Sequence, residues 1–582
     1  MNSILEAMHY GKPMIVVPLF ADQQLNSKAV ERRGMGIILE RHLLNKKTLT
    51  EALKHVMGSK EIARKCALVA SILAGRPKQY RQEIAKWAKI ITEHGNIADV
   101  LTADGHNVTI FSPTMDPDVT TFGNRLPART LRFTAHGTND RFHRMEMKRP
   151  SLWESPPCTG VCFKWSDYDL VHEQNMDYCK EFLEDEGTIK ALSDSKFELV
   201  FTESFDMCAP GIFQILGINK IVMVSALGMY HPMYDIIGLA ELPSFMPEGL
   251  TPYSDDMTFL ERLTNFKVNI QLKFHIRRWN REFWKVFNAK YPGFPTIQEI
   301  NNEKTCLIMT NVNEFAETPR PTTNMIKYVG GSTLHDPKAL PEDLDKLLNE
   351  RSATVLFSLG SIAQSKDMPS WLKNDIIETF ASFPNVTFIW KYEGDDTSSF
   401  NAVPNIHPMK WVPQTDLLAD KRLSLFITHG GMNSMLESMF HGKPMIVIPL
   451  FGDQQLNSKN VIRIGTGMLV DRNNLNKNTL TEAIQRTLGN KKIAREAAFV
   501  ASSLAGRPQQ YREDIAKWAK IIIEHGKMNH LLLHSRNMNL IQYYGLDILA
   551  FLVSIAAVVV FLFLWLLKRV ISSFRIIKLK CD

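Results

Sequence analysis

The sequence lacks several features that would assign it to a simple class. Its formal net charge is only +7 over 582 residues, and five of its cations lie in the last fifteen residues, so no nucleic-acid surface is indicated. Its hydrophobic fraction of 45% is ordinary for a globular protein and excludes general disorder. The seven cysteines include one close pair, Cys158 and Cys162, without the second pair that a four-ligand metal site needs, which favours a disulfide or free thiols.

The N-terminus lacks the basic start and apolar run of a signal peptide, and it begins inside a repeat instead. Residues 1–95 align without a gap with residues 432–526, and about two thirds of the positions are identical. A solenoid consists of several adjacent repeats, so a segment that occurs only twice and far apart in the sequence does not indicate one. We expect residues 1–95 to be a partial duplicate of a later domain that forms no second active site, although it contains Glu6, Asp22 and Gln23, the equivalents of Glu437, Asp453 and Gln454.

One stretch, residues 424–455, contains a complete βαβ pattern. An apolar strand at 425–428 ends at a His-Gly-Gly turn, a helix follows in which Ser434 and Glu437 have the spacing of a capping box, and a second strand is predicted at 445–450. The turn directs backbone N–H groups and the positive end of a helix toward one point. This geometry favours an anionic ligand, and a diphosphate fits it.

Polar side chains cluster at the carboxyl ends of these two strands. Taken singly, Glu437 and Asp453 are explained as helix caps and His429 as a satisfied strand-end histidine. Together with Asn433 and Gln454 they mark the edge where open α/β sheets bind ligands. We therefore interpret the cluster as a binding site.

The pattern of these residues resembles the donor-binding signature of the UDP-glycosyltransferases, specifically the membrane-bound animal UDP-glucuronosyltransferases. The matching positions extend over more than forty residues: Trp411-Val412-Pro413-Gln414, Thr428-His429-Gly430-Gly431, Asn433-Ser434, Glu437, Gly442-Lys443-Pro444, Pro449-Leu450-Phe451 and Asp453-Gln454. The resemblance implies two Rossmann-like α/β domains facing a cleft, the glycosyltransferase B fold. It also implies transfer of a hexuronic acid or hexose from a UDP-sugar to a lipophilic hydroxyl, with inversion, and with no metal or cofactor beyond the UDP-sugar co-substrate.

The resemblance also implies a role for each site residue. Trp411 and Gln414 would hold uracil and the nucleoside, Glu437 the ribose, and Asp453 with Gln454 the sugar hydroxyls. The phosphate-facing positions would be Ser361, His429, Gly431, Asn433 and Ser434.

The acid–base machinery is expected to be incomplete. The family places a carboxylate at the end of the strand 197–202, where Glu203 aligns with Asp206 close behind. Its base histidine would fall nine residues before Asp99, a position that Ile90 occupies. His94 lies four residues too late, so we expect the base histidine to be absent.

Residues 548–567 are twenty uncharged residues, long enough to cross the roughly 30 Å hydrocarbon core of a bilayer, and Lys568-Arg569 places the tail in the cytosol. The C-terminal sequence KLKCD resembles a dilysine signal for the endoplasmic reticulum. The expected organisation is 1–95 duplicate, 96–320 acceptor-binding domain without its start, 321–530 UDP-sugar-binding domain, 546–567 transmembrane helix and 568–582 cytosolic basic tail. The expected partners are UDP-sugar, a small lipophilic acceptor and the lipid bilayer; a homo- or hetero-oligomer is compatible with them.

Three hypotheses follow. The first is a detoxifying UDP-glucuronosyltransferase, or a UDP-glucose-dependent relative, whose start is mis-assembled; transcripts continuous across residues 95 and 96 would contradict the mis-assembly. The second is a catalytically silent protein that binds UDP-sugar or modulates a partner enzyme in the same membrane, which nucleotide binding without turnover would favour. The third, a dinucleotide-dependent oxidoreductase, is disfavoured because no GxGxxG turn joins a predicted strand to a helix.

The sequence generates one prediction about the chain as written. Without a signal peptide, we expect Asn107 and Asn385, both in N-x-T sequons, to stay unglycosylated and transferase activity to be negligible. Replacing residues 1–95 by a signal peptide and a helix bearing the base histidine should restore both. A glycosidase-sensitive mobility shift or robust turnover from the unmodified chain would contradict this expectation.

Overall fold

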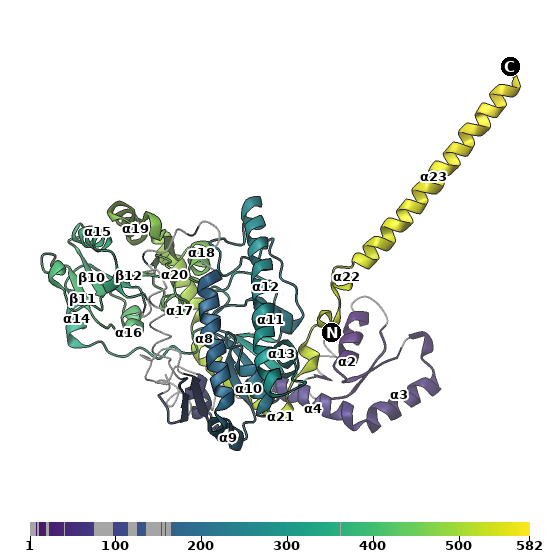
Figure 1. The fold of residues 1–582 in the computed structure, drawn as a ribbon, viewed down its shortest axis with the longest axis horizontal. Helices are drawn as coiled ribbons and strands as arrows, with labels where there is room; N and C mark the ends of the chain where they lie inside the picture. Colours follow the sequence, from purple (N-terminus) through teal and green to yellow (C-terminus); the bar gives the residue numbers. More distant parts are fainter. Residues whose placement is uncertain are drawn as a thin grey trace.

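The computed structural model describes residues 7–8, 11–18, 23–39, 41–74, 97–113, 125–135, 153, 158, 165–360 and 363–581. Over these ranges the fold is α/β, and its strands form a six-stranded sheet, a four-stranded sheet and two two-stranded sheets, in all of which neighbouring strands are parallel. Figure 1 shows a body of two α/β units, with a long C-terminal helix projecting from it. The expected α/β architecture is confirmed.

The larger sheet has the order β11-β10-β9-β12-β13-β14. Its strands are β9 (Ala353–Ser358), β10 (Val386–Lys391), β11 (Ile406–Met409), β12 (Leu423–Thr428), β13 (Met445–Val447) and β14 (Gly467–Leu469). Successive side chains point to opposite faces: Phe357 packs in one core with α15 (Ser370–Ala381) and α19 (Lys477–Gly489), whereas Leu356 packs in the other core with α17 (Met432–Phe440). Both faces are therefore buried, as the uninterrupted apolar strands require.

The helices of this unit precede, connect or follow these strands in the sequence. They are α14 (Glu342–Asn349), α15 (Ser370–Ala381), α16 (Gln414–Ala419), α17 (Met432–Phe440), α18 (Gln454–Ile464), α19 (Lys477–Gly489) and α20 (Lys491–Leu504).

Two local expectations for the central stretch are wrong. The second strand ends at Val447 and not at residue 450, because Pro449 has no N–H to continue a ladder. The capping box is absent: α17 begins at Met432 after Gly431, so Ser434 lies inside the helix. Glu437 accepts hydrogen bonds from side chains outside the helix instead.

The four-stranded sheet belongs to the preceding part of the chain. Its strands, in the order of the sheet, are β5 (Val200–Glu203), β6 (Ile221–Ser225), β7 (Thr305–Thr310) and β8 (Ile326–Tyr328); β3 (Thr109–Pro113) and β4 (Arg129–Phe133) form a separate pair. Its helices are α6 (Ile97–Ala103), α8 (Trp165–Glu184), α9 (Glu186–Asp194), α10 (Ala209–Ile215), α11 (His231–Ile237), α12 (Phe259–Lys290) and α13 (Ile297–Lys304). A disulfide that the sequence did not indicate, Cys179–Cys208, joins α8 to the start of α10.

Two segments beyond residue 320 pack with this first sheet. Strand β8 hydrogen-bonds to β7, with Ile326 opposite Ile308. Helix α21 (Arg507–His525) returns to the same unit, where Ile515 and Ile522 share a core with Leu307. The division of the sequence into domains at 96–320 and 321–530 stays a prediction. Strand β8 and helix α21 belong to the second range in sequence but pack with the sheet of the first.

The N-terminal copy reproduces the local structure of its duplicate. The elements β1 (Met14–Val16), α2 (Gln23–Arg32), β2 (Gly36–Ile38), α3 (Lys46–Gly58) and α4 (Lys60–Ala74) correspond to β13, α18, β14, α19 and α20. Within the described residues, β1 and β2 pair only with each other, and they contribute to a small separate core. This unit, purple in Figure 1, lies beside the C-terminal segment, where the Arg32 guanidinium donates to the His530 and Leu532 carbonyls at 3.5 and 3.4 Å.

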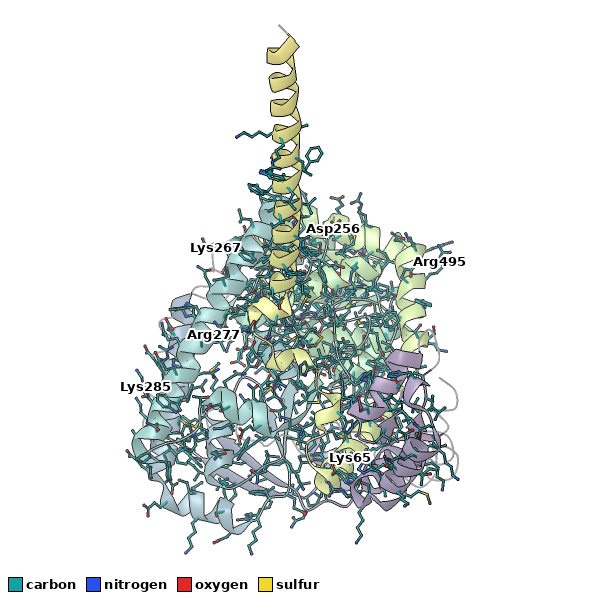
Figure 2. The ribbon with its side chains drawn as sticks, turned by 90° about the vertical axis from the view of Figure 1, so that its right-hand side faces the viewer. Lys65, Asp256, Lys267, Arg277, Lys285 and Arg495 are labelled. Carbon is teal, nitrogen blue, oxygen red and sulfur yellow. A yellow bond between two sulfur atoms is a disulfide. The ribbon has the colours of Figure 1, made fainter. Side chains whose placement is uncertain are left out.

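The chain ends in α22 (Leu540–Tyr543) and α23 (Leu546–Cys581). Among the described residues, the segment Leu546–Arg569 is the one helix that is long and apolar enough to cross a membrane, and it is fully exposed. Figure 1 shows α23 projecting away from the body, and in Figure 2 its upper part extends beyond the body. The expected transmembrane helix at 546–567 lies within it, and the helix continues through the basic tail.

The duplicated strand pair generates a matched prediction. A Cβ added at Gly467 would lie 2.1 Å from the Met445 carbonyl oxygen, and one at Gly36 would lie 1.9 Å from that of Met14. We expect Gly467→Ala to separate β14 from β13 and to lower the thermal midpoint of the six-stranded unit by about 3 to 10 °C. Gly36→Ala should leave that midpoint unchanged. Limited proteolysis with detection by mass spectrometry shows which unit loses stability in each variant. Equal protease cleavage within residues 321–530 in both variants would contradict the independence of the six-stranded unit and the N-terminal copy.

Candidate functional site

A cavity of about 760 Å³ lies at the carboxyl edge of the six-stranded sheet. It is lined by the ends of three strands and the first turns of two helices, including Ser358, Gly360, Lys391, Trp411, Gln414, Thr415, Asn433, Ser434 and Glu437. Parallel strands direct all their carboxyl ends to this edge, which is why residues far apart in sequence converge here. We call it the polar cavity.

Three of the predicted residues form one hydrogen-bond network in the polar cavity. The Gln414 amide nitrogen donates to Ser434 Oγ at 3.1 Å and to the Glu437 carboxylate, and Thr415 Oγ1 donates to Glu437 at 3.0 Å. Burial raises the pKa of Glu437, and the bonds from Gln414 and Thr415 oppose that rise. Trp411, just beyond β11, is 74% exposed and offers the face of its ring to a planar ligand.

His429 lies between two glycines. A Cβ at Gly360 would come within 2.7 Å of its Cε1, and one at Gly431 within 2.6 Å of its Nε2. Gly360 has φ 80°, a left-handed conformation that other residues adopt only with strain. Burial lowers the pKa of His429 to about 4, and the charge of Lys391 contributes, so the ring is neutral at physiological pH.

Lys391 is a cavity residue that the sequence reasoning missed. Its Nζ donates to the Gly360 carbonyl at 2.6 Å and to Glu393 at 3.0 Å, and it lies 5.7 Å from the centroid of the Trp411 ring. A lysine that ends the buried apolar strand VTFIWK was the available signal, because such a position falls at the ligand-binding edge.

The remaining predicted donor residues have different surroundings. Asn433 is exposed and accepts a hydrogen bond from the Asn311 amide at 2.8 Å, which joins the two units. Asp453 accepts from the Asn457 amide at 2.6 Å, and burial raises its pKa. The Gln454 side-chain oxygen accepts from the backbone N–H groups of Leu450 and Phe451, so this oxygen holds its own loop and does not face a ligand.

An apolar cavity of about 460 Å³ lies where the two units meet. Its walls include Leu272, Ile276, Trp279 and Phe283 of α12, and Met432, Phe451 and Asp453 of the six-stranded unit. Its polar lining also includes His172, Asn175, Tyr230, Glu241, Glu248, Glu317, Arg320, Asn457 and Asn460. Met432 and Asn433 are consecutive, so the apolar and polar cavities share the N-terminal turn of α17.

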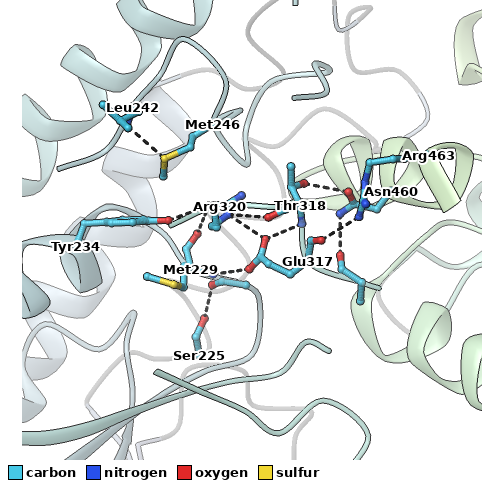
Figure 3. Close-up of polar contacts among 12 residues, drawn as sticks. Ser225, Met229, Tyr234, Leu242, Met246, Glu317, Thr318, Arg320, Asn460 and Arg463 are labelled. Atoms are coloured by element: carbon cyan, nitrogen blue, oxygen red, sulfur yellow. Dashed lines mark hydrogen bonds and ion pairs between the residues drawn. The ribbon is translucent and has the colours of Figure 1, made fainter. Parts of the chain in front are cut away.

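Direct bonds fix the two units at this junction (Figure 3). Thr318 Oγ1 donates to Asn460 Oδ1 at 2.9 Å, and the Asn460 amide donates to the Ala316 carbonyl at 2.7 Å. Arg463 donates to the Glu317 carbonyl at 2.9 Å. These bonds between the units therefore fix the position of the apolar cavity relative to the polar cavity.

The predicted catalytic carboxylates lie at the end of β5. Glu203 accepts from Ser204 N and Oγ at 2.9 and 2.8 Å and from Ala226 N at 3.2 Å, while burial raises its pKa. Asp206 accepts from Cys208 N and Ala209 N at 2.9 and 3.0 Å, so its carboxylate satisfies the start of α10, and burial raises its pKa too. Neither lines either cavity.

Several sequence-based expectations fall outside the described residues. They concern Ser361, Glu6, Asp22, the side chain of Gln23, Ile90, His94 and Cys162. Cys158 is disulfide-bonded.

The environment of His429 generates a pH prediction. Because the Lys391 charge lowers the pKa of His429, we expect Lys391→Met to raise it from about 4, while the matched loss of charge Lys421→Met leaves it unchanged. The ¹³C signal of labelled histidine, assigned by its loss in His429→Gln, measures the titration. An imidazole that titrates near pH 6.5 in the unmodified chain would contradict the buried, neutral ring.

Comparisons with known proteins show the family to which the chain is related. The family model described as "UDP-glucoronosyl and UDP-glucosyl transferase" matches residues 1–122 and 78–581. The chain is 27% identical to the "Putative UDP-glucuronosyltransferase ugt-50" of Caenorhabditis elegans over 78% of this chain and 87% of that protein. It is 26% identical to the mouse (Mus musculus) "UDP-glucuronosyltransferase 2B17" over 84% and 92% of the two chains.

A solved structure supports the fold. The glycotransferase of kitacinnamycin superimposes with a TM-score of 0.50 at 17% identity, covering 74% of this chain and 95% of that one. The two-unit arrangement is thus the glycosyltransferase B fold that the sequence predicted. With a family match along nearly the whole chain and α/β units that meet beside a polar cavity, the protein belongs to the UDP-glucuronosyl and UDP-glucosyl transferase family.

Proposed function

We propose that the protein transfers glucuronic acid from UDP-glucuronate to a hydroxyl group of small lipophilic acceptors, with inversion at the anomeric carbon. The observation that carries the proposal is the pair of cavities that share the first turn of α17. A charged, polar donor and an apolar acceptor need separate sites that meet at the reacting bond. Residues Met432 and Asn433 mark that meeting point.

The polar cavity suits a uridine diphosphate. The open ring face of Trp411 would stack on uracil, Gln414 would bond the nucleoside, and the Glu437 carboxylate would accept the ribose hydroxyls. The N-terminal turn of α17 and the Lys391 ammonium would meet the diphosphate. These groups stabilise the negative charge that develops on the departing UDP, with the neutral His429 ring beside them.

The apolar cavity suits the acceptor, and Asp453 at its edge would bond the sugar hydroxyls. Deprotonation of the acceptor as it attacks is worth about 10² to 10⁴ in rate when a positioned base performs it. The base histidine of this step is expected to be absent from this chain. Of the two carboxylates that would orient such a histidine we choose Glu203, because the carboxylate of Asp206 is held by two backbone N–H groups at the start of α10. Gln454 is assigned a supporting role for the loop that carries Asp453.

We further propose that α23 anchors the protein in the endoplasmic reticulum membrane. The exposed apolar segment Leu546–Arg569 and the dilysine pattern of the last five residues, KLKCD, support this location. The acceptor cavity would then serve lipophilic molecules that partition into the same membrane, as a detoxifying enzyme requires.

A donor panel tests the proposed function. The chain, with its start replaced as described above, is incubated with a lipophilic phenol and UDP-glucuronate, UDP-glucose or UDP-galactose, and products are identified by mass spectrometry. We expect the glucuronide to dominate. Glucoside as the main product would move the protein to the UDP-glucose-dependent members, and UDP binding without any product would favour a silent UDP-sugar-binding protein.

The polar cavity generates a binding prediction. Glu437→Ala removes charged hydrogen bonds to ribose, each worth about 1.5 to 3 kcal/mol, so we expect UDP to bind about 10- to 100-fold more weakly. His429→Ala should also weaken it. The matched change Glu6→Ala in the N-terminal copy should have no effect, because among the described residues the strands of that copy, β1 and β2, pair only with each other and not with a larger sheet. Calorimetric titration measures all three; equal losses at Glu6 and Glu437 would show a second functional half-site.

A further inference from the structure

The apolar cavity contains a buried carboxyl group that the transfer reaction does not use. Glu248 lies in the segment between α11 and α12, lines the cavity and is only 8% exposed. Its backbone N–H donates to Asn265 Oδ1 at 2.8 Å, and its Oε1 accepts from Asn269 Nδ2 at 2.5 Å. Among the described residues its second oxygen, Oε2, has no hydrogen-bond partner, and it is not among the fully buried atoms. This oxygen is therefore available to a molecule in the cavity.

The other buried charges around Glu248 are already paired. Glu241 accepts from Asn269 Nδ2 at 3.0 Å, lies in hydrogen-bond contact with His231 Nδ1 at 2.7 Å and forms an ion pair with Lys273 at 3.0 Å. Arg320 forms an ion pair with Glu317 at 3.1 Å, and both side chains are almost completely buried (Figure 3). Glu248 has a neutral amide as its side-chain partner, as does Asp453 on another wall of the cavity. A buried carboxylate without a cation is costly, so a cation bound beside Glu248 would be favourable.

The electrostatics agree with this imbalance. Burial and then the negative charge of Glu241 raise the pKa of Glu248 to about 7, while Asn269, His231 and Arg320 oppose the rise. Burial would also raise the pKa of Glu241, but His231 and Lys273 lower it to about 2. Near neutral pH, Glu241 is thus an anion with its own partners, whereas Glu248 changes between acid and anion.

We propose that Glu248 recognises the ammonium group of a lipophilic amine that also carries the hydroxyl to be glycosylated. This acceptor class rests on the proposed function, and it adds a specificity residue to it. The aliphatic and aromatic wall of α12 accommodates the apolar part of such a molecule, and the rings of Trp279 and Phe283 tolerate a nearby cation. The ammonium group supplies the positive charge that Glu248 lacks, and Glu248 acts in binding rather than in the chemical step.

Two acceptors of nearly equal shape test the proposal: 4-(2-aminoethyl)phenol, which is a cation, and 4-propylphenol, which is neutral. At pH 8 we expect Glu248→Gln to raise the KM for the amine by about 10-fold or more, with kcat unchanged, because it removes a charged hydrogen bond. The KM for 4-propylphenol should stay within about twofold. Asp256→Asn, which removes the same charge from an exposed position of the same segment, should change neither.

The pH dependence supplies a second readout. In the chain with its start replaced as for the donor panel and with Glu248 retained, the KM for the amine should fall as pH rises from 6 to 8, because Glu248 loses its proton over that range while the amine stays charged. Glu248→Gln should abolish this dependence. A folded Glu248→Gln chain should also melt at a higher temperature than the unmodified chain at pH 8 but not at pH 5, since a raised carboxyl pKa destabilises the fold as pH rises through it.

The outcomes separate this proposal from the proposed function. If Glu248→Gln turns over 4-propylphenol and its KM for the amine rises no more than its KM for 4-propylphenol, the role of Glu248 is overturned. The transferase function then still stands. If neither phenol is a substrate, calorimetric binding of 4-(2-aminoethyl)phenol to the full chain decides. Binding that weakens about 10-fold in Glu248→Gln supports recognition without transfer, and equal binding to both chains overturns it.

Discussion

The polar cavity depends on the parallel pairing of β9 with β12 at the centre of the six-stranded sheet. Ser358 lies opposite Thr428 in that register, so both strands end together and the next residues emerge at one edge. Gly360 and Gly431, which have no Cβ, leave the space that the His429 ring occupies. The neighbouring strands β10 and β11 add Lys391 and Trp411 at the same edge. A shift of register by one residue would reverse every side chain and dismantle the cavity.

The second constraint is the junction between the two units. Helix α17 provides Met432 to the apolar cavity and Asn433 to the polar cavity, while Asn311, just after β7, bonds Asn433 from the other unit. The bonds of Thr318 to Asn460 reinforce this contact. Helix α21 packs against the first sheet, so the chain passes between the two units a second time. The positions of the two cavities therefore depend on the fold as a whole.

The sequence predicted the secondary-structure elements and contacts that follow from hydrophobic periodicity and residue spacing. The apolar run before a glycine turn predicted β12 and α17, and the convergence of Gln414, Ser434 and Glu437 followed from parallel topology. Side-chain orientation was not predictable, because the Gln454 oxygen turns back to its own loop only in the folded state. The Cys179–Cys208 disulfide was also beyond reach, since seven cysteines allow many pairings. An apolar stripe on α21 does not say which sheet it covers.

The most direct test of the account is a cryo-electron microscopy structure of the full chain with UDP bound. We expect uracil density against Trp411, ribose hydroxyls at Glu437, and the diphosphate between Lys391 and the first turn of α17. The N-terminal copy should be empty at the same UDP concentration. Nucleotide density away from the carboxyl edge of the six-stranded sheet, or none at saturating UDP, would contradict the assignment of this cavity to the donor.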